Sequence, residues 1–114
     1  MPEYFFDPAA GATFAGGTFG KSDVARGRTM FLGLNCFAPG QSQAVHAHAG
    51  ADKFYLVLSG NARIAVGDES REARAGTLAW APAGVPHGVT EVTEPTVMLV
   101  GMSPPPGPRP RSPG

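Results

Sequence analysis

Short runs of apolar residues, separated by turns rich in glycine and proline, make up most of this chain. Residues 53–59 (KFYLVLS) are nearly all apolar after the first, which is typical of a strand buried on both faces. The polar run 70–75 predicts a solvent-facing strand. No segment of helical length carries apolar residues at i, i+3 and i+4, so the sequence predicts no helix. Strands are expected at Thr29–Ala38, Ala44–His48, Lys53–Ser59, Ala62–Val66, Ser70–Ala75, Thr77–Ala81, His87–Val92 and Thr96–Met102, with one or two short edge strands in residues 2–27.

Two tight-turn dipeptides, Gly60-Asn61 and Gly67-Asp68, bracket one of these strands and predict a meander of hairpins. About nine short strands without a helix indicate an all-β fold, an antiparallel barrel or sandwich. We expect residues 1–102 to form a single domain. Residues 103–114 contain half of the chain's 12 prolines and predict an extended, disordered Pro-rich C-terminal tail.

Composition and charge narrow the possible partners and location. The length of 114 residues suits one domain, and nine basic residues balance nine acidic ones, so no surplus of positive charge favours nucleic acid. No apolar run is long enough to cross a bilayer, and the acidic N-terminus does not resemble a signal peptide. The single cysteine, Cys36, excludes an internal disulfide. We therefore expect a cytoplasmic protein with neither a nucleic-acid nor a membrane partner.

The chain has three histidines: His46, His48 and His87. His46 and His48 are two residues apart in a predicted strand, so their side chains leave the same face. His87 begins a strand directly after the rigid turn of residues 82–86. Imidazoles that converge inside a barrel suit a divalent first-row transition metal. The alternative is a surface pair of histidines and an unrelated turn residue.

The residues around the histidines follow two spaced patterns. The first is Gly40, five residues, His46-x-His48, four residues, Lys53, six residues, Gly60; the second is Gly76, five residues, Pro82-x-Gly84, two residues, His87, three residues, Glu91. With fifteen residues between them, these blocks resemble the two motifs of the cupin superfamily, in its small single-domain bacterial form (the cupin 2 conserved barrel). The resemblance spans residues 40–91, about half of the chain. It implies an antiparallel jelly-roll barrel in which the three histidines bind one divalent ion of Fe, Mn, Zn, Ni or Cu.

The sequence departs from the cupin pattern at Lys53, where the family has a glutamate ligand. Three outcomes are open. The metal keeps three histidines and leaves positions for water and substrate, as in catalytic sites. Alternatively, Asp52 supplies the carboxylate, which needs a bulge between the two residues. In the third case there is no metal, Lys53 forms an ion pair inside the barrel, and the pocket binds an organic acid.

Four further residues are candidates for the site. Lys53 and Tyr55 share a strand face and are the expected catalytic pair, which handles protons or binds an anion. Glu91 replaces the family's asparagine and is expected either to point into the lumen, where it compensates Lys53 and binds substrate, or to be an exposed strand end. Trp80 is expected either in the substrate-binding wall or in the core.

The leading functional hypothesis is a metal-dependent enzyme acting on a small organic substrate, of oxygenase, isomerase/cyclase or lyase type. The alternative is a non-catalytic cupin that binds a small molecule without metal, in a pocket built around Lys53. The apolar N-terminal residues Tyr4, Phe5 and Phe6 are too hydrophobic to be left in water, which predicts a homodimer.

Overall fold

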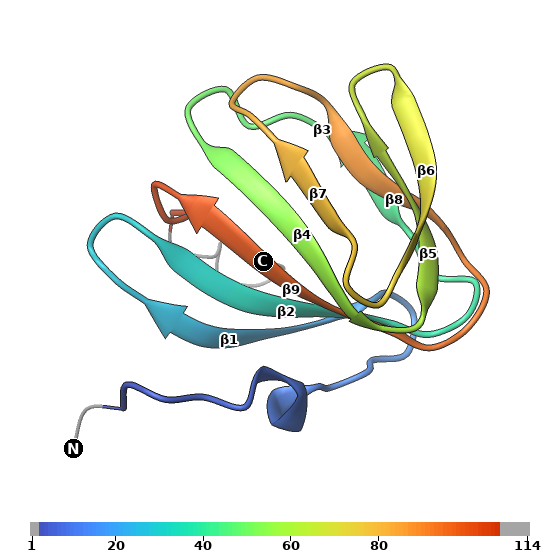
Figure 1. Ribbon diagram of the computed structural model, residues 1–114, viewed down its shortest axis with the longest axis horizontal. Coiled ribbons are helices and arrows are strands. Elements are labelled where there is room, and N and C mark those ends of the chain that lie inside the picture. The colour runs from blue at the N-terminus through green and yellow to red at the C-terminus, as the bar shows by residue number, and fades with distance from the viewer. Residues whose placement is uncertain (1–2, 108–114) are drawn as a thin grey trace.

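The computed structural model describes residues 3–107, which form nine β-strands and one short 3-10 helix (Figure 1). The all-β prediction is confirmed, and the one addition is a single 3-10 turn that begins at Pro8. In chain order the elements are η1 (Pro8–Gly11), β1 (Gly20–Arg26), β2 (Phe31–Phe37), β3 (Gln43–His46), β4 (Asp52–Ser59), β5 (Asn61–Val66), β6 (Glu69–Arg74), β7 (Leu78–Ala81), β8 (His87–Val92) and β9 (Thr96–Ser103).

The strands form two antiparallel sheets that enclose the core as a jelly roll. One sheet has the order β1-β2-β9-β4-β7, and the other has the order β3-β8-β5-β6. Each sheet therefore ends in two edge strands, and Figure 1 shows the sheets spreading apart from a common base. Two grooves result, one bordered by β1 and β3, the other by β6 and β7. The candidate chemistry lies in the first groove.

The core lies between the inner faces of the sheets. Along β4 the side chains alternate strictly, so that Lys53, Tyr55 and Val57 are buried and the residues between them are only partly covered. The expectation that this strand is buried on both faces therefore holds fully only for its inner face. Ile64, Val89 and other apolar side chains pack against Tyr55 and Val57. Burying each of these large side chains stabilises the fold by roughly 1.5–3 kcal/mol.

The outer face of the β1-containing sheet is covered in part by the N-terminal segment. Leu34, Cys36 and Val97 form a second apolar cluster there, and Ala12 packs against it. Burial raises the pKa of the Cys36 thiol, so this cysteine is a neutral core residue.

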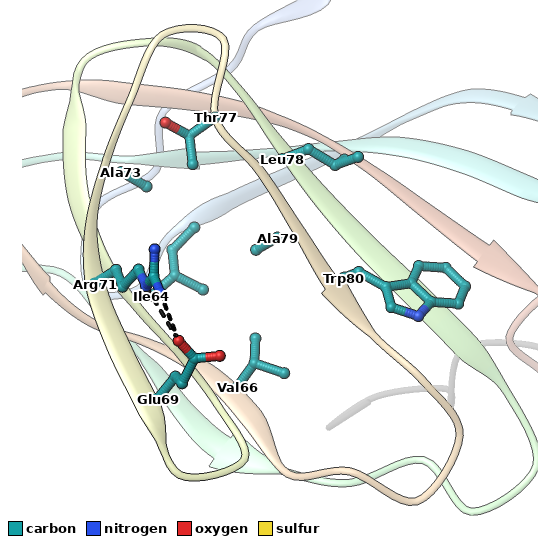
Figure 2. Close-up of a pocket in the computed structure, with 9 residues that line it drawn as sticks. All are labelled: Ile64, Val66, Glu69, Arg71, Ala73, Thr77, Leu78, Ala79 and Trp80. Atoms are coloured by element: carbon teal, nitrogen blue, oxygen red, sulfur yellow. Dashed lines mark hydrogen bonds and ion pairs between the residues drawn. The ribbon is translucent and has the colours of Figure 1, made fainter.

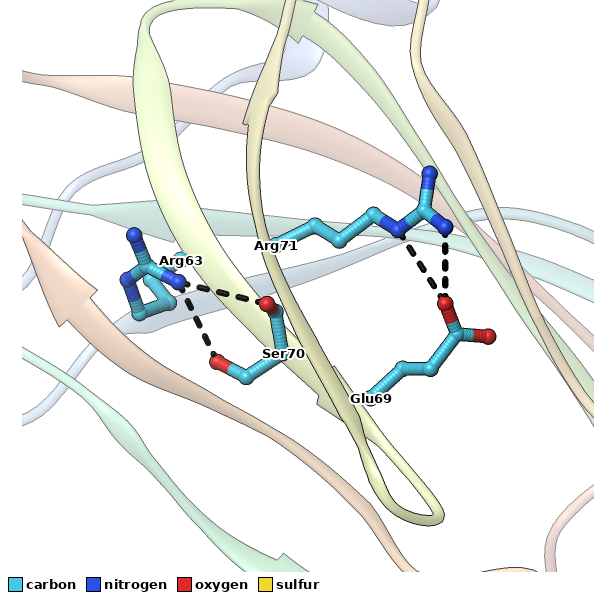
Figure 3. Close-up of polar contacts among 4 residues, drawn as sticks. All are labelled: Arg63, Glu69, Ser70 and Arg71. Atoms are coloured by element: carbon cyan, nitrogen blue, oxygen red, sulfur yellow. Dashed lines mark hydrogen bonds and ion pairs between the residues drawn. The ribbon is translucent and has the colours of Figure 1, made fainter.

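The β5–β6 hairpin carries an exposed polar network (Figure 3). The Arg63 guanidinium donates to the carbonyl and hydroxyl oxygens of Ser70, at 3.3 and 3.4 Å. Arg71 donates from Nε and Nη2 to the same Glu69 carboxylate oxygen, at 3.1 and 2.8 Å. Both side chains of this ion pair are more than 70% exposed, so it contributes little to stability.

The segment predicted as a disordered tail begins in a strand, because β9 includes Ser103. The next four residues continue along the barrel mouth, where the Arg26 side chain donates to the Pro106 carbonyl at 2.9 Å. The rest of the predicted tail, residues 108–114, lies outside the described residues. The described part of the chain contains no helix with the length and apolar character of a membrane span.

Candidate metal centre

Strand pairing brings the three histidines together. His46 ends β3 and His87 begins β8, and the two are direct partners across the antiparallel β3–β8 ladder. His48 follows β3 by two residues. Their ring centroids are 4.6, 4.8 and 5.3 Å apart, so the three imidazoles form one cluster at the barrel mouth.

Backbone contacts hold the loops that carry these rings. The Gly84 N–H donates to the His48 carbonyl at 2.9 Å, which ties the turn before His87 to the end of the first motif. The Asp52 carboxylate accepts from the Ala83 N–H at 2.9 Å. Asp52 is exposed and its carboxylate binds this turn, so it lies outside the histidine cluster. Of the three outcomes considered for the missing glutamate, the one that uses Asp52 as a ligand is therefore not supported.

Hydrogen bonds to backbone carbonyls fix two of the ring tautomers. His46 Nδ1 lies 2.8 Å from the Ala44 carbonyl and His87 Nδ1 lies 3.0 Å from the Val85 carbonyl. A carbonyl only accepts, so both Nδ1 atoms carry the hydrogen and both Nε2 atoms present a lone pair. Metal-binding histidines are oriented in the same way by their second ring nitrogen.

The three histidines bring their ring nitrogens close together. His46 Nε2 and His48 Nε2 are 3.1 Å apart, and the ligand atoms of all three histidines lie within 4.8 Å of one another. His87 Nε2 is buried and is the one buried side-chain nitrogen or oxygen in residues 3–107 without a hydrogen-bond partner. An unpartnered buried nitrogen is costly, and a bound cation would remove that cost.

Burial and neighbouring positive charge favour the neutral form of His48 and His87 by lowering the pKa of each. The pKa of His48 is lowered first by burial and then by His46, Lys53 and His87. The pKa of His87 is also lowered first by burial, and Lys53 and His46 add to the effect against the opposing hydrogen bond to Val85. Neutral imidazole is the form that binds a metal, so the donor set, its tautomers and its protonation fit a first-row divalent ion.

Lys53 points into the barrel and is 8% exposed. Its Nζ lies 4.8 Å from the centre of the Tyr55 ring. Burial, and secondarily the charge of Lys21, lowers the pKa of Lys53 to about 8. The family's acidic position is thus occupied by a cation that faces the same pocket as the histidines.

Tyr55 supports this site from behind. Its side chain is fully buried, and its hydroxyl donates to Oε1 of Gln43, which lines the pocket. The Tyr55 ring meets the His87 ring edge-on at 6.0 Å. Burial raises the pKa of Tyr55, so the phenol stays protonated. Its contacts position Gln43 and His87.

Neither Trp80 nor Glu91 lines the pocket that contains the histidines. Trp80 is 55% exposed and lines the groove bordered by β6 and β7, where its ring points outward (Figure 2). Glu91 is exposed beside the buried Val92, because the β5–β8 register shifts at Thr90 and turns Glu91 to the outer face. The expected pairing of Glu91 with the inward-facing Lys53 is therefore corrected.

β1 contributes residues to this pocket that the two motifs did not predict. Lys21 and Arg26 line it, and both lie in the segment that we interpreted as loops with short edge strands. The alternation of Lys21 and Asp23 was the available signal for an edge strand with polar residues on its inner face. The motifs alone could not reveal it, because β1 precedes both.

Fold and site together define a jelly-roll barrel with a candidate three-histidine metal centre. The model of the cupin domain family matches residues 33–102. An uncharacterized protein of Streptomyces coelicolor is 38% identical over 80 residues, which cover 70% of this chain and 75% of that protein. The chain therefore belongs to the cupin domain family, as the motif spacing predicted.

Solved structures agree. The TT1209 protein of Thermus thermophilus is similar with a TM-score of 0.85 and 36% identity, covering 90% of this chain and 98% of that one. An RmlC-like cupin of Desulfovibrio desulfuricans is similar with a TM-score of 0.77 and 27% identity, covering 93% and 99%. Both similarities span nearly the whole of each chain, which supports a small single-domain cupin.

Proposed function

We propose that this protein is a metal-dependent enzyme that acts on a small organic substrate at the three-histidine centre. The buried, unpartnered Nε2 of His87, in a cluster where one ligand atom from each of His46, His48 and His87 lies within 4.8 Å of the others, carries this proposal. Three protein ligands leave coordination positions open, which is the arrangement of catalytic sites. Iron, manganese, zinc, nickel and copper all accept imidazole ligands of this kind.

The residues of the site have different roles in this proposal, which follow from their positions. His46, His48 and His87 hold the ion, which supplies Lewis-acid polarisation of substrate oxygens. The Lys53 side chain, buried beside them, binds a substrate oxygen or gives it a proton. Tyr55 keeps Gln43 oriented toward the pocket and packs against His87. With iron the site suits oxygenase chemistry on a bidentate substrate, and with zinc, manganese or nickel it suits isomerase/cyclase or lyase chemistry.

Lys53 itself favours a second candidate function. A cation in place of the family's acidic ligand repels a divalent ion, and a metal-free barrel that binds an organic anion around Lys53 avoids this repulsion. In that case the chain is a binding module without turnover. Lys53 then has the same ligand-binding role, and the histidines act as neutral hydrogen-bonding groups.

The metal content of the purified protein distinguishes the enzyme from the metal-free binding module. The chain, purified without a histidine tag, is expected to carry close to one equivalent of a transition metal by mass spectrometry. His46→Ala, at a partly exposed position, should abolish uptake while the circular dichroism spectrum is unchanged. Less than about a tenth of an equivalent, with no uptake from added ions, would overturn the enzyme proposal in favour of the binding module.

We also propose a cytoplasmic homodimer. Tyr4 and Phe5 are 79% and 92% exposed in the single chain, and apolar side chains so exposed favour burial against a second copy. Light scattering at micromolar concentration should give twice the chain mass. A shift to the monomer mass on Phe5→Ser would confirm that the N-terminal segment forms the dimer interface. A monomer for the unaltered chain would contradict this assembly.

A further inference from the structure

The groove beside the histidines carries a strong local excess of positive charge. It has a cavity volume of about 470 Å³, which suits a small organic ligand. Its charged side chains are Lys21, Arg26 and Lys53 against the single carboxylate of Asp23. The protein as a whole is neutral, with nine basic and nine acidic residues, so the excess belongs to this groove.

Each of the three cations lies over an aromatic ring. Lys21 Nζ is 5.2 Å from the centre of the Phe19 ring, the Arg26 guanidinium carbon is 5.3 Å from that of Phe31, and Lys53 Nζ is 4.8 Å from that of Tyr55. A ring face orients a cation without neutralising its charge or accepting its full set of N–H donors. The Arg26 guanidinium also donates from Nη2 to the Pro106 carbonyl at 2.9 Å, and its other N–H groups, with the two lysine amines, remain oriented for a ligand.

The strand register shows how two of these cations are spaced. Arg26 pairs with Phe31 across β1 and β2, Phe31 with Met102 across β2 and β9, and Met102 with Lys53 across β9 and β4. These four residues form one row across the sheet, and all four line the groove. Three strand spacings of about 4.8 Å put the backbones of Arg26 and Lys53 about 14 Å apart.

The middle of that row is apolar. Phe31 and Met102 lie between the two cations and form the floor of the groove. Lys21 also lines the groove, but it pairs with Asn35, four positions along β2 from Phe31, so it lies outside this row. The row therefore has a cation at each end, Arg26 and Lys53, and an apolar floor between them. The histidine cluster lies at the Lys53 end.

We propose that the substrate is an organic dianion with an apolar middle, such as a dicarboxylate. One acidic group binds at Lys53 beside the histidines, and the other binds at Arg26, while the connecting carbons lie on Phe31 and Met102. The inference rests on the proposed function in assigning the reacting end to the histidine-held ion. It names the opposite end as a separate subsite on β1, which sets the length and charge of the substrate.

Calorimetric titration of the full chain, in metal-free and metal-loaded forms, tests this assignment. The probes are the straight-chain diacids from succinate to suberate, followed by the monoamide and diamide of the diacid that binds most tightly. We expect that diacid to bind at least about tenfold more tightly than its monoamide, and the diamide to bind weakest. Equal affinities for diacid and diamide, or no binding by any diacid, would overturn the proposal.

Variants locate the second subsite. Arg26→Gln should weaken the diacid about tenfold and leave the monoamide nearly unchanged, because the monoamide lacks the carboxylate that Arg26 binds. Arg71→Gln makes the same change in the opposite groove and should alter neither affinity. If Arg26→Gln weakens diacid and monoamide equally, the residue acts through the fold and the subsite is wrong.

The same samples keep this inference separate from the proposed function. Metal content is measured by mass spectrometry for every variant, and Arg26→Gln should retain it. Full metal loading without any preference for diacids would overturn the substrate class alone. A clear preference for diacids in a chain that takes up no metal would overturn the enzyme proposal and leave the anion site intact.

Discussion

The two grooves of the barrel are similar in size and opposite in character. The β1/β3 groove has a volume of about 470 Å³ and the β6/β7 groove about 440 Å³. The first contains three converging imidazoles and three cations that face rings. The second has an apolar floor that includes Ile64, Val66 and Ala79, and its Arg71 is already paired with Glu69 (Figure 2). Volume alone does not distinguish them.

What distinguishes the grooves is whether their polar groups are satisfied. At the β6/β7 groove Arg71 and Glu69 form an exposed ion pair, so neither charge needs a ligand to be satisfied. At the β1/β3 groove the buried His87 Nε2 has no partner, and the buried Lys53 amine lies on a ring. Such unmet groups cost stability, and a functional site is a common reason for their presence. The predictions below set one groove against the other.

The largest difference is expected for metal affinity. His46→Ala removes one of three nitrogen donors and should lower affinity by at least about 100-fold, more than the loss of an outer hydrogen bond does. Arg71→Ala in the other groove should leave affinity unchanged. Competition titration against a chromophoric chelator measures both. A chain that binds metal as well after His46→Ala would place the ion elsewhere.

Next in size is the effect of replacing Lys53. Burial lowers its pKa from 10.5 to about 8, so at pH 7 the folded protein bears the cost of a buried charge, roughly 3 kcal/mol at most. Lys53→Met should therefore raise the free energy of unfolding of the metal-free protein at pH 7 by up to that amount. Urea denaturation measures the change, and a destabilised Lys53→Met protein would show that the amine makes favourable contacts.

The difference in the free energy of unfolding between the unaltered protein and Lys53→Met should depend on pH with a definite sign. Between pH 8 and 10.5 the unfolded chain keeps the Lys53 proton while the folded protein has lost it. The unfolded state then binds more protons, so the stability of the unaltered protein rises with pH relative to Lys53→Met. Ionisation of Tyr55 affects both proteins alike and cancels in the comparison. Below about pH 8 the difference should be constant.

A smaller effect is expected at Gly88, where β8 passes close to β3. A Cβ at this position would lie 2.8 Å from the Gln43 carbonyl oxygen and 2.9 Å from the Val45 backbone. Gly88→Ala should separate the strands that carry His46 and His87, lowering metal affinity about tenfold and the free energy of unfolding by about 1–3 kcal/mol. Gly50→Ala, which meets nothing within 4 Å, is the matched control. Equal effects of the two substitutions would contradict the close approach.

The smallest effect is expected in the β6/β7 groove. Arg71→Gln breaks an exposed ion pair and should change the free energy of unfolding by less than about 1 kcal/mol. Thermal denaturation in low and high salt measures it. A large loss of stability or of ligand affinity would show that the second groove has a role of its own.

Much of the fold could be predicted from the chain, because period-two alternation and turn residues determine strands locally. The strand predicted at Lys53–Ser59 differs from β4 by one residue, and the three histidines converge as the spacing indicated. The choice between Asp52 and Lys53, which the motif left open, is settled by the structure: Lys53 faces inward and Asp52 is exposed. No bulge was needed between them.

Features that depend on pairing between strands could not be predicted. Glu91 is turned outward by a register shift between β5 and β8, which simple alternation from His87 does not anticipate. Trp80 faces outward because it pairs with Phe54, on the face of β4 opposite to the buried Lys53 and Tyr55, and this pairing of β7 with β4 is a long-range property. Arg26 and Lys53 share one row only through β2 and β9, so the charge pattern of the groove emerged only from the assembled sheet.

The most direct test of the account is an anomalous difference map from crystals grown with the ion that the purified protein carries, or with zinc if it carries none. We predict one strong peak about 2.0–2.3 Å from Nε2 of His46, His48 and His87, and none in the β6/β7 groove. No peak at the histidines, or a peak bound by fewer than three of them, would contradict the three-histidine centre.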